Sequence, residues 1–249
     1  MTCEPARQAF DPAALDFSMF SRDDLVNLAL QRSEVLAEVP RYGQLIRAWE
    51  RGNQAPLEVQ VGRMGVRVAR QAARIIGREF DSLIPAIDPL QPGRVADIGC
   101  GYAIFDLFAY GRHGCSLLLI DLEETEHRHF GFETEGAAYT SLATARKFLA
   151  ANGVPDAKVT VWNPDRGDLP EATRVDLAVS FLSCGFHFPV DMYLPFFRFA
   201  VRSGGAIVLD LRAGRAPAAV EQLRRIGKLS TLAREPGLRR VLVEKKAGK

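Results

Sequence analysis

The chain has 249 residues, of which 47% are hydrophobic and 25% charged, and its formal net charge is +2. This composition is typical of a globular domain and excludes a disordered or collagen-like chain, while so small a net charge gives no reason to expect a nucleic-acid-binding surface. Neither an apolar signal-peptide segment nor a run of about 18 apolar residues occurs, and the four cysteines show no paired metal-type spacing, so we expect a cytoplasmic protein with no membrane-spanning segment.

The first 88 residues carry helical spacing and no strand alternation. Ser21 and Asp24 can cap a helix that runs from Leu25 through Leu36. Further helices are expected over residues 42–51 and 57–80. Because the apolar stripes of these helices are too few for a core of their own, we expect residues 1–88 to form a cap or lid on a domain at 89–249, with a short hinge at 89–92.

The expected helix over residues 57–80 has a basic face. Five arginines recur along it, at positions 63, 67, 70, 74 and 78. Such a stripe is either a solvated helix surface or an electrostatic contact for an anionic substrate or partner.

Strand and helix patterns alternate after residue 93, which predicts a doubly wound, mostly parallel α/β sheet covered on both faces. Strands are expected at 94–98, 116–121, 158–162, 175–180 and 205–210, followed by a hairpin of 229–233 and 239–244. Helices are expected at 104–110, 193–201 and 216–226, and Ser203-Gly204 is expected as the turn that ends the second of these.

A glycine turn follows the first expected strand. Gly99 and Gly101 allow torsions that other residues resist and let a ligand approach the main chain, while the next helix points free N–H groups at that ligand. A dinucleotide site would favour a third glycine, but position 104 is Ile. The residues alone also allow a plain strand-to-helix turn.

This stretch resembles the first motif of class I S-adenosylmethionine-dependent methyltransferases, which have a Rossmann-like fold. In that superfamily an acidic residue followed by G-x-G holds the amino-acid end of the cofactor, and here Asp97, Gly99, Cys100 and Gly101 match it. Ala103 stands where many members have another glycine. The terminal hairpin after five strand-helix units also matches this superfamily, so S-adenosylmethionine is the expected cofactor.

Three further positions match cofactor contacts of the superfamily. Asp121 ends the second strand, where a carboxylate accepts hydrogen bonds from two ribose hydroxyls, although it could instead cap a helix. Asn163 follows the third strand and would contact the adenine, a role that Asp165 or Asp168 could also fill. Ser180 ends the fourth strand and is expected to contact the cofactor.

A closer resemblance rests on two stretches, the long loop 122–138 and the segment 183–190. Together they are similar to a small group of presumed sugar O-methyltransferases. This resemblance implies a hydroxyl of a small polar acceptor, a sugar or a glycosylated metabolite, as the methyl acceptor. The expected substrate-binding residues are His127, His129, Tyr139 and Phe186.

His187 is the expected general base. It follows the fourth strand, where the superfamily lines the transfer site, and its unperturbed pKa near 6.5 suits a base at neutral pH. A loop histidine with a purely structural role is the alternative. His127 and His129 make a poor metal pair and no third ligand has clear spacing, so we expect no metal, with Asp191 and Asp210 as the remaining candidate ligands.

Two other classes of function stay open. An N-methyltransferase of a protein, peptide or nucleic acid would favour an Asn/Asp-Pro-Pro-aromatic turn after the fourth strand, but the chain has Ser180-Phe-Leu-Ser-Cys-Gly there. A non-catalytic binding module of the same fold would lose the cofactor carboxylates, and both are present. The oligomeric state is left open, a dimer included.

Overall fold

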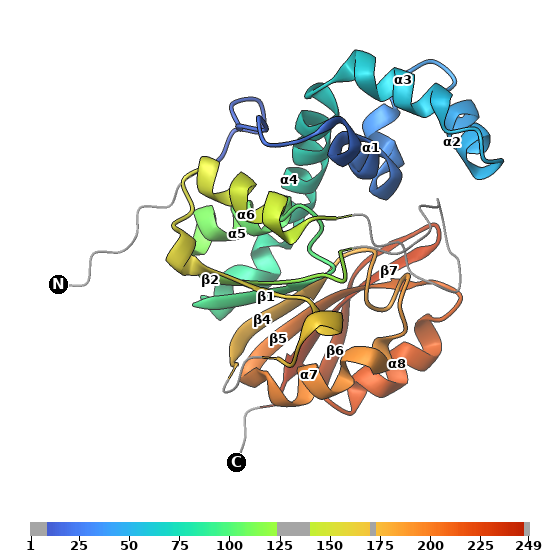
Figure 1. Ribbon diagram of the computed structural model, residues 1–249. Coiled ribbons are helices and arrows are strands. Elements are labelled where there is room, and N and C mark those ends of the chain that lie inside the picture. Colours follow the sequence, from blue (N-terminus) through green and yellow to red (C-terminus); the bar gives the residue numbers. More distant parts are fainter. Residues whose placement is uncertain (1–8, 124–139, 170–172, 247–249) are drawn as a thin grey trace.

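The computed structural model describes residues 9–123, 140–169 and 173–246. The strands are β1 (Arg94–Ile98), β2 (Ser116–Ile120), β3 (Val159–Trp162), β4 (Val175–Ser180), β5 (Val201–Arg212), β6 (Gly227–Glu235) and β7 (Leu238–Lys245). They form one seven-stranded sheet of order β3-β2-β1-β4-β5-β7-β6 (Figure 1). Strands β1 to β5 are parallel, and β7 is antiparallel to both of its neighbours. The predicted mostly parallel sheet with a terminal hairpin is therefore confirmed.

Helices cover both faces of this sheet (Figure 1). They are α1 (Arg22–Gln31), α2 (Tyr42–Glu50), α3 (Ala55–Met64), α4 (Arg67–Ile87), α5 (Ile104–His113), α6 (Leu142–Ala151), α7 (Leu194–Phe199) and α8 (Ala216–Arg224). Within the described ranges, no helix has the length and apolar character needed to cross a membrane.

Alternate residues of the central strands enter two hydrophobic cores, one on each face of the sheet. In β2, Leu117 and Leu119 face the first core, whereas Leu118 and Ile120 face the second. Helices α1, α4, α5 and α6 complete the first core, and α7 and α8 complete the second. Both faces of the sheet are thus buried, which explains why its parallel strands read as continuous apolar runs.

The N-terminal helices share the first core with the sheet. Buried Leu28 of α1 and Ala72 of α4 belong to the same cluster as Val95 of β1. Helix α4 also lies close along α5, since a Cβ on Gly77 would stand 3.2 Å from Cζ of Phe108. The predicted domain boundary at residue 88 stays a prediction, but the first hydrophobic core contains residues from both sides of it.

The beginning of the chain confirms one predicted helix signal and corrects another. Ser21 caps α1 as predicted, because its Oγ accepts from the Asp24 N–H at 3.1 Å while the Asp24 carboxylate accepts from the Ser21 N–H at 2.8 Å. The helix does not continue through Leu36, since it ends at Gln31 and a separate 3₁₀ turn covers Ser33–Leu36.

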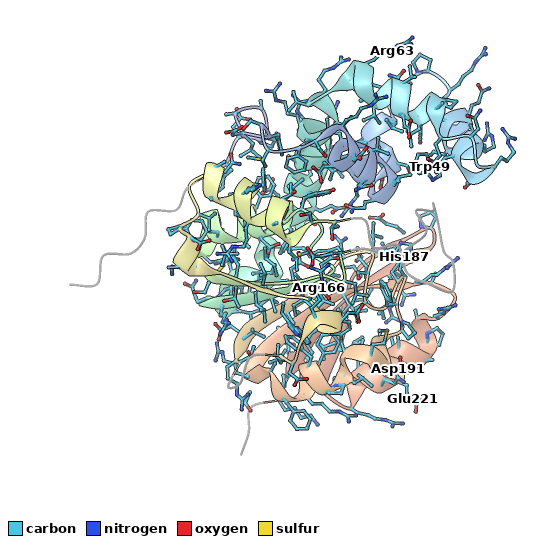
Figure 2. The ribbon with its side chains drawn as sticks, in the orientation of Figure 1. Trp49, Arg63, Arg166, His187, Asp191 and Glu221 are labelled. Atoms are coloured by element: carbon cyan, nitrogen blue, oxygen red, sulfur yellow. The ribbon has the colours of Figure 1, made fainter. Side chains whose placement is uncertain are left out.

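The single helix predicted over residues 57–80 is wrong. Helix α3 ends at Met64 and α4 begins at Arg67 and continues past Phe80 to Ile87. Gly65 lies at the break with φ 55°, a torsion that glycine adopts without steric cost, so the helix ends there. The predicted basic face is therefore divided between two helices, with Arg63 on α3 (Figure 2).

The turn predicted at Ser203-Gly204 is also wrong. Helix α7 ends at Phe199, and both residues lie within β5. The pairing of β5 with β4 begins at Val201 opposite Val175 and then shifts register before it continues. This irregular strand start depends on the neighbouring strand, so the local glycine signal was misleading.

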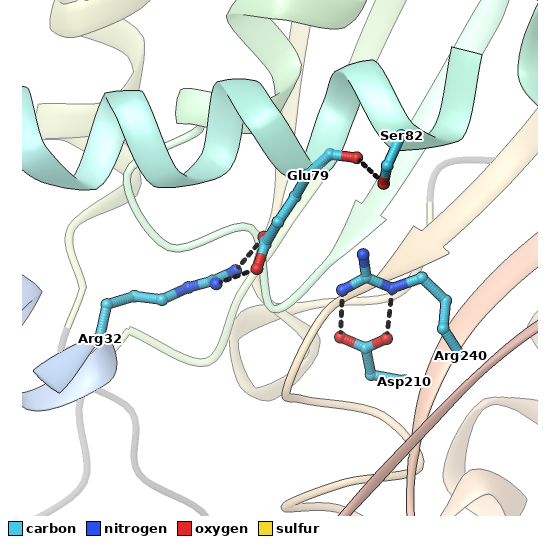
Figure 3. Close-up of polar contacts among 5 residues, drawn as sticks. All are labelled: Arg32, Glu79, Ser82, Asp210 and Arg240. Atoms are coloured by element: carbon cyan, nitrogen blue, oxygen red, sulfur yellow. Dashed lines mark hydrogen bonds and ion pairs between the residues drawn. The ribbon is translucent and has the colours of Figure 1, made fainter. Parts of the chain in front are cut away.

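A buried ion pair joins β5 to β7. Asp210 and Arg240 face each other in the strand register, and their side chains form two parallel hydrogen bonds of 2.6 and 2.8 Å (Figure 3). Asp210 is fully buried and Arg240 is 8% exposed. The guanidinium also lies 4.8 Å from the ring centroid of Phe181, in the segment after β4.

We expect Asp210→Ala to lower the free energy of unfolding by about 3–5 kcal/mol, because it leaves a buried guanidinium unpaired. The double variant Asp210→Ala/Arg240→Met should recover part of this loss. Urea denaturation measures both. Glu221→Ala is the control, since it breaks an exposed pair with Arg225 and should cost less than about 1 kcal/mol. Equal losses in Asp210→Ala and the control would show that the buried pair contributes nothing special.

Candidate functional site

The glycine loop after β1 is packed directly against the segment after β4. Gly99 and Gly101 have φ values of 73° and 57°. A Cβ on Gly99 would stand 2.3 Å from the Ser183 Oγ, so only glycine fits there. The Gly99 N–H donates to the Ile120 carbonyl at 2.7 Å, which ties the loop to the end of β2. The loop is therefore held between two neighbouring strand ends.

Ala103 is the N-cap of α5 and adopts the left-handed conformation, with φ 57° and ψ 30°. This conformation costs an L-residue about 1–2 kcal/mol, and glycine avoids the cost. The backbone at this position thus gives a physical reason for the glycine that many proteins with this motif have there.

Asp121 closes the glycine loop from the side of β2. Its Oδ2 accepts from the Gly101 N–H at 3.0 Å, and its Oδ1 accepts from the Glu123 N–H at 3.1 Å. Helix α6 has a different N-cap, Ser141, whose Oγ accepts from Thr144. Burial raises the pKa of Asp121, and these hydrogen bonds oppose the rise. The carboxylate is therefore oriented beside the loop.

Asp97 and Asp106 form a buried carboxyl pair between β1 and α5. Burial raises the pKa of Asp97 well above its usual range, and the charges of Asp106 and Asp121 add to the rise. Burial likewise raises the pKa of Asp106 to about 7. Because both pKa values are raised, the two carboxyls together retain a proton near neutral pH. Within the described residues, Oδ1 of Asp97 has no donor from another polar group.

Helix α1 is fixed to the glycine loop. The Tyr102 hydroxyl donates to Oδ1 of Asp24 at 2.8 Å, and Asn27 donates to the same hydroxyl at 3.3 Å. At the end of α1, Oε1 of Gln31 lies 3.4 Å from the position that a Cβ on Gly101 would take. The end of this helix thus lies over the loop.

Arg32 follows α1 and binds Glu79 of α4 through two hydrogen bonds, of 2.6 and 2.9 Å (Figure 3). The Arg32 side chain is 11% exposed and that of Glu79 is 29% exposed. This pair joins two N-terminal helices at the wall of the site.

Two side chains define the segment after β4. Ser180 is fully buried, and its hydroxyl donates to the Ile98 carbonyl at 2.6 Å and accepts from the Cys184 N–H at 2.8 Å. These bonds hold the ends of β1 and β4 together. His187 lies further along this segment. Its backbone N–H donates to the Ser183 carbonyl, and its ring centroid is 5.2 Å from that of Phe186.

One pocket brings these elements together at the carboxyl edge of the sheet. Six of the predicted site residues line it: Asp97, Gly99, Cys100, Gly101, Asp121 and His187. His187 lies between the sheet and the N-terminal helices (Figure 2). Burial raises the pKa of the Cys100 thiol well above its usual range, so this group lines the pocket as a neutral thiol.

Other predicted site residues lie elsewhere. Asn163, Ser180 and Phe186 do not belong to the described lining of this pocket. The Asn163 amide donates to the Leu122 carbonyl and to Glu123, and its oxygen accepts from the Asp165 N–H, so it holds the segment after β2. Its predicted adenine contact stays a prediction. His127, His129 and Tyr139 lie outside the described residues.

The sequence predicts that the N-terminal helices cap the rest of the chain, but it did not identify which of their residues line the pocket. Leu28, Arg32, Ile76 and Glu79 all line it, together with Tyr193 from the segment before α7. The five arginines that repeat at helical spacing form a pattern that the sequence shows directly. Arg32 and Glu79 are 47 positions apart in the sequence, and no local pattern predicts that they pair.

No group of three or more His, Cys, Asp or Glu side chains with metal-binding geometry occurs in the described part of the chain. Of the two candidate ligands, Asp210 is engaged by Arg240.

The sequence matches no family model and no curated protein. Solved structures are similar in fold. A presumed O-methyltransferase from Nostoc punctiforme PCC 73102 is 10% identical with a TM-score of 0.51, and the match covers 72% of this chain and 59% of that one. An O-methyltransferase family protein from Burkholderia thailandensis is 14% identical with a TM-score of 0.48, over 90% of this chain and 73% of that one.

A third similar structure, a 16S rRNA methyltransferase from T. thermophilus in complex with AdoMet and guanosine, is 17% identical with a TM-score of 0.48, over 70% of this chain and 43% of that one. At such identities the likeness shows the fold alone. Of these three structures, the Nostoc protein is the one with a TM-score above 0.5, and it carries that conclusion.

The carboxyl pair makes stability depend on pH. Because the pKa values of Asp97 and Asp106 are raised in the folded state, the folded chain binds more protons than the unfolded chain between about pH 4 and pH 7. The contribution of the pair to stability is therefore present at low pH and is lost as pH rises through the folded-state pKa values.

Asp106→Asn should accordingly raise the free energy of unfolding by about 1–3 kcal/mol at pH 8 and by less at pH 5. Urea denaturation at the two pH values measures the difference. Asp156→Asn, at an exposed acid paired with Arg146, is the matched control and should show little pH dependence between these values. An equal effect of Asp106→Asn at both pH values would contradict the shared proton.

Proposed function

We propose that this protein is an S-adenosylmethionine-dependent methyltransferase that acts on a hydroxyl of a small polar acceptor, a sugar or a glycosylated metabolite. One observation carries the proposal. The glycine loop, Asp97 and Asp121 meet in one pocket at the carboxyl ends of adjacent parallel strands, which is where open α/β sheets bind ligands.

The residues present fit this cofactor at both ends. Asp97 offers a buried carboxyl oxygen that no described protein donor uses, a suitable acceptor for the ammonium of the amino-acid end. Gly99 and Gly101 have no Cβ, so the cofactor could lie directly against the main chain beside Asp97. Asp121 keeps lone pairs for ribose hydroxyls, because each of its oxygens accepts one backbone hydrogen bond from the described residues.

The chemistry asks the protein for position, dryness and a base. The cofactor would supply a methyl group bound to a positively charged sulfur. The protein would hold the acceptor hydroxyl in line with that methyl and exclude water with apolar side chains such as Phe181 and Phe188, which line the pocket. His187 lines the same pocket and would accept the hydroxyl proton as the methyl group is transferred.

The first test is cofactor binding by calorimetry. Asp121→Ala should weaken S-adenosylmethionine binding by about 1.5–3 kcal/mol, the range for a hydrogen-bonding charged group. Asp156→Ala, at the exposed pair with Arg146, should leave the affinity unchanged. A thermal unfolding scan verifies that the Asp121 variant is folded, since this carboxylate also holds the Gly101 N–H. Unchanged affinity in a folded Asp121 variant would remove Asp121 from the site.

The second test is methyl transfer from labelled S-adenosylmethionine to a panel of sugars, glycosides and phenols. With an accepted substrate, His187→Ala should lower kcat by roughly 10²–10⁴ and leave cofactor affinity nearly unchanged, because a positioned base contributes to the transition state alone. A loss of about tenfold or less would give His187 a structural role. Cofactor binding without transfer to any hydroxyl would favour a different acceptor class or a non-catalytic module.

A further inference from the structure

A guanidinium and a buried carboxyl group line the same pocket. Asp97 lies near the end of β1, and Arg32 follows α1. Both side chains line this pocket, and the positive charge of Arg32 lowers the pKa of Asp97, although burial outweighs this effect. A ligand that carries both an ammonium and a carboxylate would find an acceptor for its ammonium in Asp97, whose raised pKa the ammonium would lower, and a counter-charge for its carboxylate in Arg32.

The position of Arg32 relative to the glycine loop is set by the contacts of α1. The hydroxyl of Tyr102 in the loop donates to Asp24 in the first turn of α1. At the other end of α1, Gln31 lies over Gly101. Arg32 is the next residue. The arginine is thus carried on an element that is attached to the cofactor loop itself.

Glu79 holds the guanidinium at the pocket wall. Its two hydrogen bonds to Arg32 use two of the five N–H donors of an arginine. The side chain of Arg32 is largely buried, and the bidentate contact fixes the plane of the guanidinium. Because the side chain of such an arginine is already ordered, binding a second carboxylate costs little further conformational entropy.

We propose that Arg32 binds the carboxylate of the amino-acid end of the cofactor, while Asp97 binds its ammonium. This rests on the proposed function, since it assumes S-adenosylmethionine as the ligand. It makes α1, a part of the N-terminal cap, a component of the cofactor site. Glu79 is then a positioning residue, because it holds Arg32 and does not itself contact the cofactor.

The experiment compares two ligands by calorimetry, S-adenosylmethionine and its decarboxylated form, which keeps the sulfonium and the ammonium but lacks the carboxylate. Wild-type protein should bind S-adenosylmethionine roughly 10- to 100-fold more tightly. Arg32→Met should remove this preference by weakening the binding of S-adenosylmethionine alone. Arg74→Met, at an exposed arginine of α4, is the matched control and should keep the preference.

Each alternative has its own signature. If Arg32→Met weakens both ligands equally, Arg32 is only structural and the proposal fails. If folded wild-type protein binds the two ligands equally well, the carboxylate has no anchor, and this result needs no variant. If wild-type protein binds neither ligand, the proposed function fails first. Arg32→Lys, which keeps the charge but loses the bidentate geometry, should retain part of the preference and covers the case in which Arg32→Met does not fold.

Discussion

The parallel pairing of β1 with both β2 and β4 is the constraint on which the site depends. Ile98 lies opposite Ile120 in the register, so the two strands end side by side. The Ile120 carbonyl then accepts the Gly99 N–H, and the Ile98 carbonyl accepts the hydroxyl of Ser180. Three strand ends are thereby tied into one edge. The loops that leave this edge begin from fixed points, and the carboxylates of Asp97 and Asp121 share one pocket as a result.

Much of this edge could be predicted because each strand and the candidate ligand-binding group after it follow each other directly in the chain. An apolar run that stops at an acidic residue or a glycine marks both the end of a buried strand and the start of a loop, as at Gly99 after β1 and Asp121 after β2. Where the geometry depends on a neighbouring strand, prediction failed. The irregular start of β5 follows from its pairing with Val175, and the Ser203-Gly204 signal could not reveal it.

The other half of the pocket could not be predicted for a different reason. Arg32 and Glu79 lie on separate helices, and each is an ordinary polar residue in its own segment. They meet because α1 and α4 pack on the same sheet face, and that packing follows from many small apolar contacts rather than from any motif. A recognisable loop therefore marks the place of the site, whereas the tertiary packing of the cap decides what surrounds it.

The two tryptophans of the chain report on opposite faces of the sheet. Trp49 of α2 is 4% exposed and belongs to the core that the N-terminal helices share with the sheet. Trp162 ends β3, stacks on Phe196 with ring centroids 6.5 Å apart, and packs against the core on the other face. Intrinsic fluorescence from single-tryptophan variants would therefore follow each core separately, so the protein carries its own optical probes for asking whether the two faces of the sheet melt in one cooperative step.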